Sequence, residues 1–237
     1  MKQIKKIGIA LMLLLSVNAV KAQTVDEVID KFLAAIGGKE KLMALNSIKL
    51  DGNLSAQGFD IGVVVTVLNG KGARTDIAVP GMSEGYRIVT PTKGWNFLPF
   101  QGMTGPEEAS EDQVKSGQSQ LDLQTSFLDY AKKGHKVELL GKEQVEKVDC
   151  YKIKITYKNG KTAVIFIDSN TYYRVKTVTT ISMGGQDTEV ETTYSDFKKT
   201  ADGYVFPYTQ VSSVSGTITY SSVEVNKPVD EKIFQPN

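Results

Sequence analysis

From Ser47 onward, apolar residues recur at every second position, and this period of two restricts most of the chain to β-strands. Two Asn-Gly dipeptides interrupt the alternation, Asn69-Gly70 and Asn159-Gly160, and Asn-Gly is the strongest short-range signal for a β-hairpin. We count about eleven short strands and no alternation of strands with helices. The pattern predicts an α+β protein built on one antiparallel sheet, with a few helices.

Two segments have helical spacing instead. Near the start, Thr24 and Glu27 have the spacing of a capping box, and the helix that they begin should end at Gly37-Gly38. The second segment runs from another capping box at Ser110 to Gly134, between the two sets of strands. We expect roughly two dozen residues of helical material there. No linker rich in proline or serine separates the strand sets, so residues 23–237 should form one domain.

The first 22 residues have the three parts of a secretory signal peptide. Lysines at positions 2, 5 and 6 precede an apolar run from Ile7 to Val17, and Val20 and Ala22 are the small residues expected before a cleavage site. The run is too short for a stable membrane span. We therefore expect export, cleavage after Ala22 and a periplasmic protein. It should not be covalently lipidated, because no cysteine stands directly after the apolar run.

Charge and cysteine content restrict the kinds of partner and of cross-link that this chain can have. Cleavage would remove four of the 28 basic residues and none of the 27 acidic ones, which leaves a slightly negative chain and argues against binding of nucleic acid. Cys150 is the only cysteine, so no intramolecular disulfide supports the fold. We interpret Cys150 as a small buried thiol at the start of a strand, and we expect a monomer.

The inventory of reactive residues argues against an enzyme. His135 is the only histidine, which excludes a zinc site with two histidines, and its basic surroundings favour a solvated side chain. The sequence contains no GxSxG, Walker or dinucleotide-binding fingerprint. We expect no catalytic residues, no metal and no cofactor.

The hairpins also predict which residues share a face. If Asn69 and Gly70 are the two central residues of their turn, Arg74 lies opposite Val65. Its guanidinium would then share a face with Val63, Val65 and Val67. In the second half, Arg174 and Lys176 should share a face with Glu189 and Glu191 as surface ion pairs.

Large apolar side chains gather beside the second helical segment. Trp95, Phe97 and Phe100 crowd a short strand and its exit loop, and Phe127 lies in the helical segment itself. Two interpretations remain open: these side chains form ordinary core, or they line an apolar pocket roofed by the segment. On the second, the ligand-binding residues are those of the valine face and the aromatic group: Arg74, Val63, Val65, Val67, Trp95, Phe97, Phe100 and Phe127.

Several segments together resemble the LolA/LolB-like superfamily, the periplasmic outer-membrane lipoprotein-sorting proteins and their relatives. They are the opening helix with Ile36-Gly37-Gly38, the run from Asp168 to Val175, and the shorter runs 194–198, 203–207 and 225–234. The resemblance covers essentially the whole mature chain. It implies a curved, unclosed β-barrel whose concave face is covered by helices and whose hollow receives lipoprotein acyl chains. It also implies that a strand arginine, here Arg74, holds the helical lid.

The sequence thus leads to a periplasmic carrier for an apolar ligand, either lipid or lipoprotein acyl chains. The alternative is a non-enzymatic module of the cell envelope, with a hollow filled by its own side chains and a protein as its partner.

Overall fold

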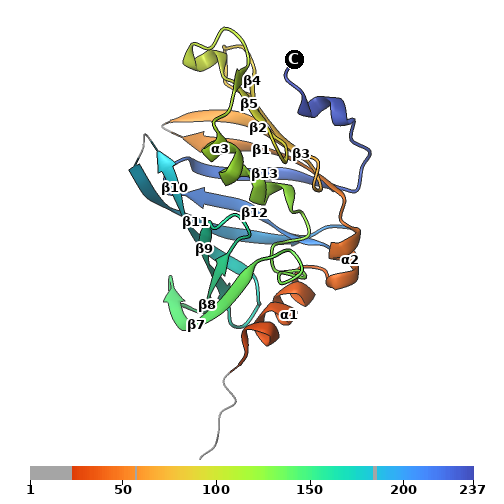
Figure 1. Cartoon of the computed structure of the whole chain (residues 1–237), viewed down its shortest axis with the longest axis vertical. Helices are drawn as coiled ribbons and strands as arrows, with labels where there is room; N and C mark the ends of the chain where they lie inside the picture. Colours follow the sequence, from red (N-terminus) through yellow and green to blue (C-terminus); the bar gives the residue numbers. More distant parts are fainter. Residues whose placement is uncertain (1–22, 57, 184–185) are drawn as a thin grey trace, which may run out of the picture.

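The computed structural model describes residues 23–56, 58–183 and 186–237, so the predicted signal peptide lies outside the described residues. The described chain forms one antiparallel sheet of thirteen strands (Figure 1). Their bounds are β1 (Ser47–Ala56), β2 (Phe59–Leu68), β3 (Gly72–Ala78), β4 (Gly85–Val89), β5 (Gly94–Phe97), β6 (Glu107–Glu108), β7 (Lys136–Val145), β8 (Val148–Thr156), β9 (Thr162–Asp168), β10 (Arg174–Met183), β11 (Gln186–Lys199), β12 (Val205–Ser212) and β13 (Gly216–Val225).

The strand order is β6-β5-β4-β3-β2-β1-β13-β12-β11-β10-β9-β8-β7, and the sheet does not close into a barrel. The predicted α+β class and the unclosed antiparallel sheet are therefore confirmed, with thirteen strands in place of about eleven. Both end strands, β6 and β7, were missed. Strand β6 has only two residues, and β7 is largely exposed and is kinked by an irregularity between Leu139 and Gly141.

The predicted helix starts are confirmed. Helix α1 (Val25–Ala35) begins with a reciprocal capping box between Thr24 and Glu27 and is followed by α2 (Lys39–Ala44). Helix α3 (Glu111–Gly117) begins with the capping box of Ser110 and continues as the 3₁₀ turn η2 (Gln118–Leu121). The expected two dozen helical residues are not formed, because residues 122–134 are turns and loops. We call the connection between β6 and β7 the 109–135 segment.

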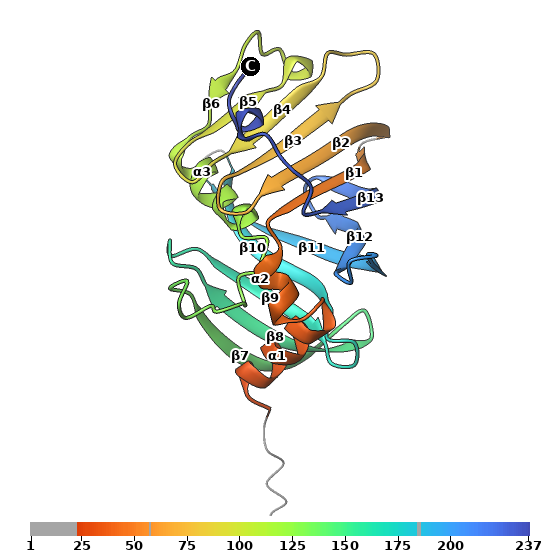
Figure 2. The ribbon, with the colours of Figure 1, turned by 90° about the vertical axis from the view of Figure 1, so that its right-hand side faces the viewer.

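The two faces of the sheet have different covers. The inner face carries Val65 and Val67 of β2 and packs on α1, α2 and the 109–135 segment in the main core. Close packing shows that α3 belongs to this face: a Cβ added to Gly117 would lie 2.8 Å from Cγ2 of Val89. Figure 2 shows α1 and α2 beside the lower strands and α3 at one side of the sheet.

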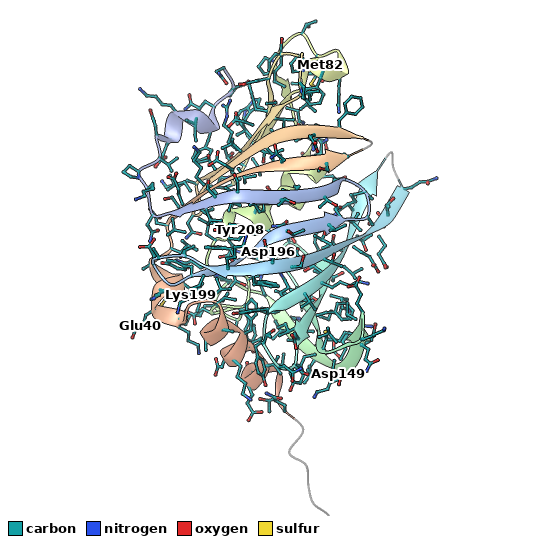
Figure 3. The ribbon with its side chains drawn as sticks, turned by 180° about the vertical axis from the view of Figure 1, so that it is seen from behind. Glu40, Met82, Asp149, Asp196, Lys199 and Tyr208 are labelled. Carbon is teal, nitrogen blue, oxygen red and sulfur yellow. The ribbon has the colours of Figure 1, made fainter. Side chains whose placement is uncertain are left out.

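The outer face is covered at one end only. The C-terminal 3₁₀ turn η3 (Glu231–Phe234) places Phe234 with Leu68, Tyr86 and Ile88 in a second, smaller core. Seen from behind (Figure 3), none of the described helices covers the outer face of β11, β12 and β13. The main core therefore lies on the inner face, and the C-terminal segment is a local cover over β3 and β4.

Both Asn-Gly hairpins have three-residue loops, and this corrects the predicted faces. Leu68 pairs with Gly72 across the first loop, so Arg74 lies opposite Thr66 and not opposite Val65. In the second hairpin the N–H of Tyr157 donates to the carbonyl oxygen of Lys161 at 2.8 Å, which leaves residues 158–160 as the loop, and Ile155 pairs with Ala163. One extra loop residue moves every side chain of the following strand to the other face. Arg74 is therefore on the outer face, away from Val63, Val65 and Val67.

Cys150 is fully buried and is not in a disulfide, as predicted. Burial raises the pKa of its thiol, and the thiolate is the reactive form of cysteine. We expect no reaction with an aromatic disulfide reagent in the native protein within minutes and full reaction in urea. A reductant should leave the thermal unfolding midpoint unchanged. Rapid native labelling, or a midpoint that falls with reductant, would contradict this placement.

Candidate functional site

A cavity of about 680 Å³ lies between the 109–135 segment and strands β8 to β10. Its volume is within the usual range of small-molecule pockets, roughly 300–1,000 Å³. Ser119 and Asp122 contribute to the wall from the segment, and Tyr157, Thr179 and Ile181 contribute from the sheet. Thr179 pairs with Ala163 and Val190, both of which are buried, so this wall continues the inner face.

His135 lies in the wall of this cavity and is partly buried, so the prediction of a solvated histidine is wrong. Its ring packs edge-on against Tyr157 at a centroid distance of 5.3 Å, and its Nδ1 accepts a hydrogen bond of 3.1 Å from the backbone N–H of Lys158. Burial lowers the pKa of His135, and the positive charge of Lys133 adds to this effect, while Asp122 opposes it. The imidazole is therefore neutral at pH 7 and fixes the start of β7 beside the turn after β8.

An ion pair holds the 109–135 segment in shape. Nζ of Lys133 lies 2.8 Å from both carboxylate oxygens of Asp122 and donates a 2.9 Å hydrogen bond to the carbonyl oxygen of Thr125. Only 24% of the Lys133 side chain and 22% of the Asp122 side chain are exposed. The loop over the cavity is thus tied to itself, and it is also tied to the sheet by several hydrogen bonds, which include those of Leu121 with Gly70 and of Leu123 with Asn69. One of them is the hydrogen bond of 3.2 Å from Asn159 Nδ2 to the carbonyl oxygen of Lys115.

Tyrosines and one arginine follow the inner face beside the cavity. The guanidinium carbon of Arg174 lies 4.3 Å from the centroid of the Tyr194 ring. Burial raises the pKa of Tyr157, while a hydrogen bond with Ser126 and the positive charge of Arg174 partly offset this increase. Burial also raises the pKa of Tyr220 to about 12, with a smaller effect from Tyr194. These side chains form a polar group on the inner face.

The raised pKa of Tyr220 makes stability depend on alkaline pH. A tyrosine phenol exposed to water has a pKa of about 10, whereas burial in the folded protein raises the pKa of Tyr220 to about 12. The neutral form therefore stabilises the folded state below about pH 10, and this contribution disappears as the pH rises through about 12. At about 1.4 kcal/mol per pKa unit, the contribution is about 2–3 kcal/mol. Between about pH 8 and about pH 12, the free energy of urea unfolding should fall less for Tyr220→Phe than for the wild type. Parallel curves would contradict burial of this hydroxyl.

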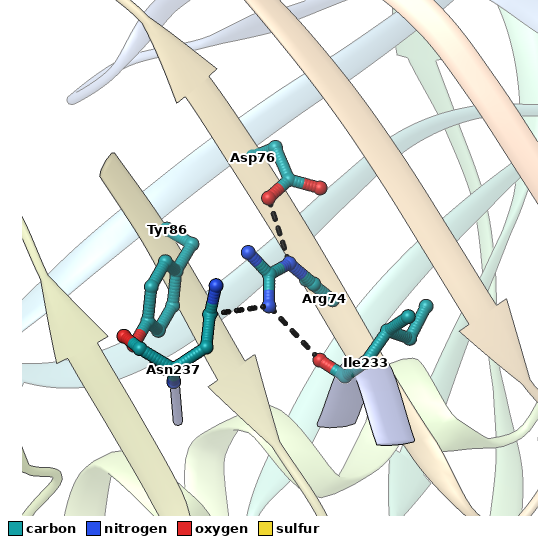
Figure 4. A network of polar contacts seen from close by, with 5 residues as sticks. All are labelled: Arg74, Asp76, Tyr86, Ile233 and Asn237. Atoms are coloured by element: carbon teal, nitrogen blue, oxygen red, sulfur yellow. Dashed lines mark hydrogen bonds and ion pairs between the residues drawn. The ribbon is translucent and has the colours of Figure 1, made fainter. Parts of the chain in front are cut away.

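Arg74 does not hold the 109–135 segment; it holds the C-terminal segment (Figure 4). Its Nε lies 2.7 Å from Asp76, and its Nη1 donates to the carbonyl oxygen of Ile233 at 3.0 Å and to Oδ1 of Asn237 at 3.2 Å. The guanidinium also stacks on Tyr86, whose hydroxyl donates to the backbone oxygen of Asn237. All of these groups lie on the outer face or in the C-terminal segment.

The other predicted site residues are divided between the faces. Val65 and Val67 belong to the main core, and Val63 lines a smaller cavity of about 300 Å³ near Asp51 and Asp76. Trp95 and Phe97 pair with Ile88 and Tyr86 and lie with them in the outer core. Phe100 lies beside Gly85, and Phe127 packs edge-on against Phe32 of α1 at 5.5 Å. The structure therefore does not bring these residues into one pocket, and their contact with a ligand stays a prediction.

Sequence reasoning missed the side chains that line the large cavity. Thr179, Ile181 and Tyr157 carry no motif, and they meet Asp122 and His135 only because the 109–135 segment folds over β8 to β10. Within the described ranges, no three histidine, cysteine or acidic side chains are grouped so that they could hold a metal ion. No described helix has the length and apolar character of a membrane span.

No protein-family model matches the chain, and no curated protein matches it in sequence. Solved structures do match. A LolA superfamily protein from Nitrosomonas europaea aligns at a TM-score of 0.56 and 14% identity over 90% of this chain and 97% of its own. A DUF1329 family protein from Desulfovibrio piger aligns at 0.58 and 13% identity over 90% and 98%. A putative outer membrane lipoprotein-sorting protein domain from Vibrio parahaemolyticus aligns at 0.52 and 16% identity over 88% and 94%.

The sheet and the 109–135 segment together define a class of protein: an open, curved antiparallel sheet with helices and a hollow on its inner face. This is the fold of the LolA superfamily proteins, as the resemblance in the sequence predicted. At 13–16% identity the likeness shows the fold alone.

Proposed function

We propose that this protein is a periplasmic carrier that binds an apolar ligand, lipid or the acyl chains of a lipoprotein, in the hollow between the 109–135 segment and the inner face. The observation that carries the proposal is the cavity of about 680 Å³, which side chains leave unfilled. Tyr157 lines the cavity and packs against the main core, so an acyl chain in the cavity would lie beside that core. The fold also supports the proposal, because one of the solved structures that share it is described as a putative outer membrane lipoprotein-sorting protein domain.

Binding of this kind requires no bond chemistry. Each methylene moved from water into an apolar site contributes about 0.8 kcal/mol, so a long chain binds tightly. Release therefore requires that the hollow open. The 109–135 segment covers the hollow and Lys133 and Asp122 hold its own shape, so opening requires that its hydrogen bonds to the sheet, such as that between Lys115 and Asn159, be broken. We propose that the segment moves as a unit.

The carrier acts in the envelope as a single LolA-like domain, residues 23–237, released by cleavage of the signal peptide and not lipidated. It is a monomer without cofactor or catalytic activity.

Mass spectrometry of the purified protein tests the proposal. The full chain is expressed with its own export signal, purified without detergent, and examined intact and after solvent extraction. We expect a near-stoichiometric acyl compound in the extract and a mass that begins at Gln23. An extract without acyl compounds, together with a copurified protein, would instead support the alternative, an envelope interaction module.

A further inference from the structure

The position of Arg174 differs from its prediction. The pairing of β10 with β9 shifts between Arg174 and Lys176, so these two residues lie on opposite faces of the sheet. Lys176 is on the outer face, where it makes the predicted ion pair with Glu191 at 2.7 Å. Arg174 is opposite Ile167, which is fully buried in the main core. The shift therefore places a guanidinium on the inner face, close to the hollow.

The guanidinium N–H donors of Arg174 are available to a ligand, whereas several of those of Arg74 are already used. Both guanidinium groups stack on a tyrosine at 4.3 Å, but Arg74 also has a carboxylate and two oxygens of the C-terminal segment. Among the residues that the structure describes, no side chain forms an ion pair with Arg174 and none hydrogen-bonds to it. Its nitrogens are also not among the fully buried unpaired atoms, so they face accessible space. A guanidinium presents five N–H donors in a fork that matches a carboxylate or a phosphate.

The ring of Tyr194 lies under this guanidinium, and Tyr194 is close enough to Tyr220 to contribute to its raised pKa. The hydroxyls of Tyr194 and Tyr220 make no hydrogen bond to any described residue, and neither oxygen is a fully buried unpaired atom, so each retains some access to solvent. Three residues along β10 from Arg174, the Oγ1 of Thr177 is buried and has no hydrogen-bond partner among the described residues. Thr177 pairs with Ile165 and with Thr192, and therefore also faces inward. Unsatisfied polar groups on an apolar face are costly, and they indicate a site for a polar ligand.

The wall of the large cavity carries mostly positive charge, which suits an anionic ligand. Its wall contains four lysines, at positions 115, 133, 158 and 161, against one acid, Asp122. Tyr157 belongs to this wall and is also close enough to Arg174 to be influenced by its charge. The cavity and the guanidinium thus lie along the same inner face, because Thr179 of the cavity wall and Arg174 both project inward from β10.

We propose that Arg174, with the hydroxyls of Tyr194 and Tyr220, binds the anionic head of an amphiphile whose acyl chain occupies the cavity of about 680 Å³. The ligand class is an acyl chain with a carboxylate or phosphate head. This inference rests on the proposed carrier function and narrows it from apolar ligands in general to acidic ones.

The test is competition by three C16 compounds for a neutral fluorescent probe, N-phenyl-1-naphthylamine, bound to the full chain. The compounds are palmitate, palmitoyl lysophosphatidate and the uncharged monopalmitin, all below their micelle concentrations. At least one of the two anions should bind the wild type about tenfold more tightly than monopalmitin, as one charged hydrogen-bonded contact provides. Which anion binds more tightly identifies the carboxylate or the phosphate as the source of the head group.

Arg174→Gln should remove this preference and leave monopalmitin within about twofold of the wild type. Lys176→Gln is the matched control, because it removes the same charge from the outer face of the same strand and should change nothing. Arg174→Lys keeps the charge but loses the fork, and should retain only part of the preference. Circular dichroism checks that each variant is folded.

The outcomes separate the two proposals. Equal binding of all three compounds, or an equal loss in Arg174→Gln and Lys176→Gln, overturns the Arg174 site and leaves the carrier function standing. If none of the three compounds and no probe binds, the carrier function fails and the head-group site fails with it.

Discussion

Thr179→Trp should reduce binding of an acyl chain by more than tenfold while the protein stays folded. Thr179 lines the large cavity, and its strand neighbours Ala163 and Val190 are buried on the same face. An indole at this position would occupy space that the ligand needs, and each methylene that is excluded costs about 0.8 kcal/mol of binding. Titration with a C16 acyl compound measures the loss.

The matched control is Val178→Trp. Val178 is the preceding residue of the same strand and pairs with Val164 and Glu191, so its side chain points to the outer face. It receives the same bulky substituent without reaching the cavity, and binding should remain within twofold of the wild type. If both tryptophans weaken binding equally, the ligand is not in this cavity; if neither does, the same conclusion follows.

Phe234→Ala should destabilise the fold by about 3–4 kcal/mol, the usual cost of removing a buried phenyl ring. Phe234 is 4% exposed and forms the centre of the outer core with Tyr86 and Ile88. Urea unfolding at neutral pH measures the change. Val214→Ala is the control, because Val214 is 49% exposed and should cost less than about 0.5 kcal/mol.

Gly72 provides an independent test of the same contact. A Cβ added there would overlap the Phe234 ring. The backbone of Gly72 is in a conformation that alanine can also adopt. Gly72→Ala should therefore destabilise the wild type and have little effect in a Phe234→Ala background. Such non-additivity is expected of residues in contact. Additive effects would mean that the C-terminal segment does not pack on β3.

The elements with a local chemical signature could be predicted from the sequence. Thr24 and Ser110 cap α1 and α3 as their spacing indicated, because a capping box is a contact between residues three apart. The antiparallel strands followed from the alternation of apolar residues. Strand β6 could not be predicted, because its two residues are a strand only through pairing with Trp95 and Asn96.

The faces could not be predicted, because each depends on one residue of register. Asn-Gly signals a hairpin but leaves the loop length open, and the structure has three-residue loops where we expected two. That difference moved Arg74 from the supposed hollow to the C-terminal segment. The irregularity before Lys176 likewise moved Arg174 from the surface to the inner face. The two arginines thus exchanged the environments that their sequence patterns suggested.

The position of the bound chain tests the carrier proposal most directly. The full chain, labelled with ¹³C at isoleucine δ-methyl groups, is mixed with a C16 acyl compound, and NMR detects which methyls lie close to the ligand. We predict contacts to Ile181, in the wall of the large cavity, and none to Ile88, in the outer core. Contacts to Ile88 without contacts to Ile181, or no contact to any methyl at saturating ligand, would contradict the proposal that the hollow carries the ligand.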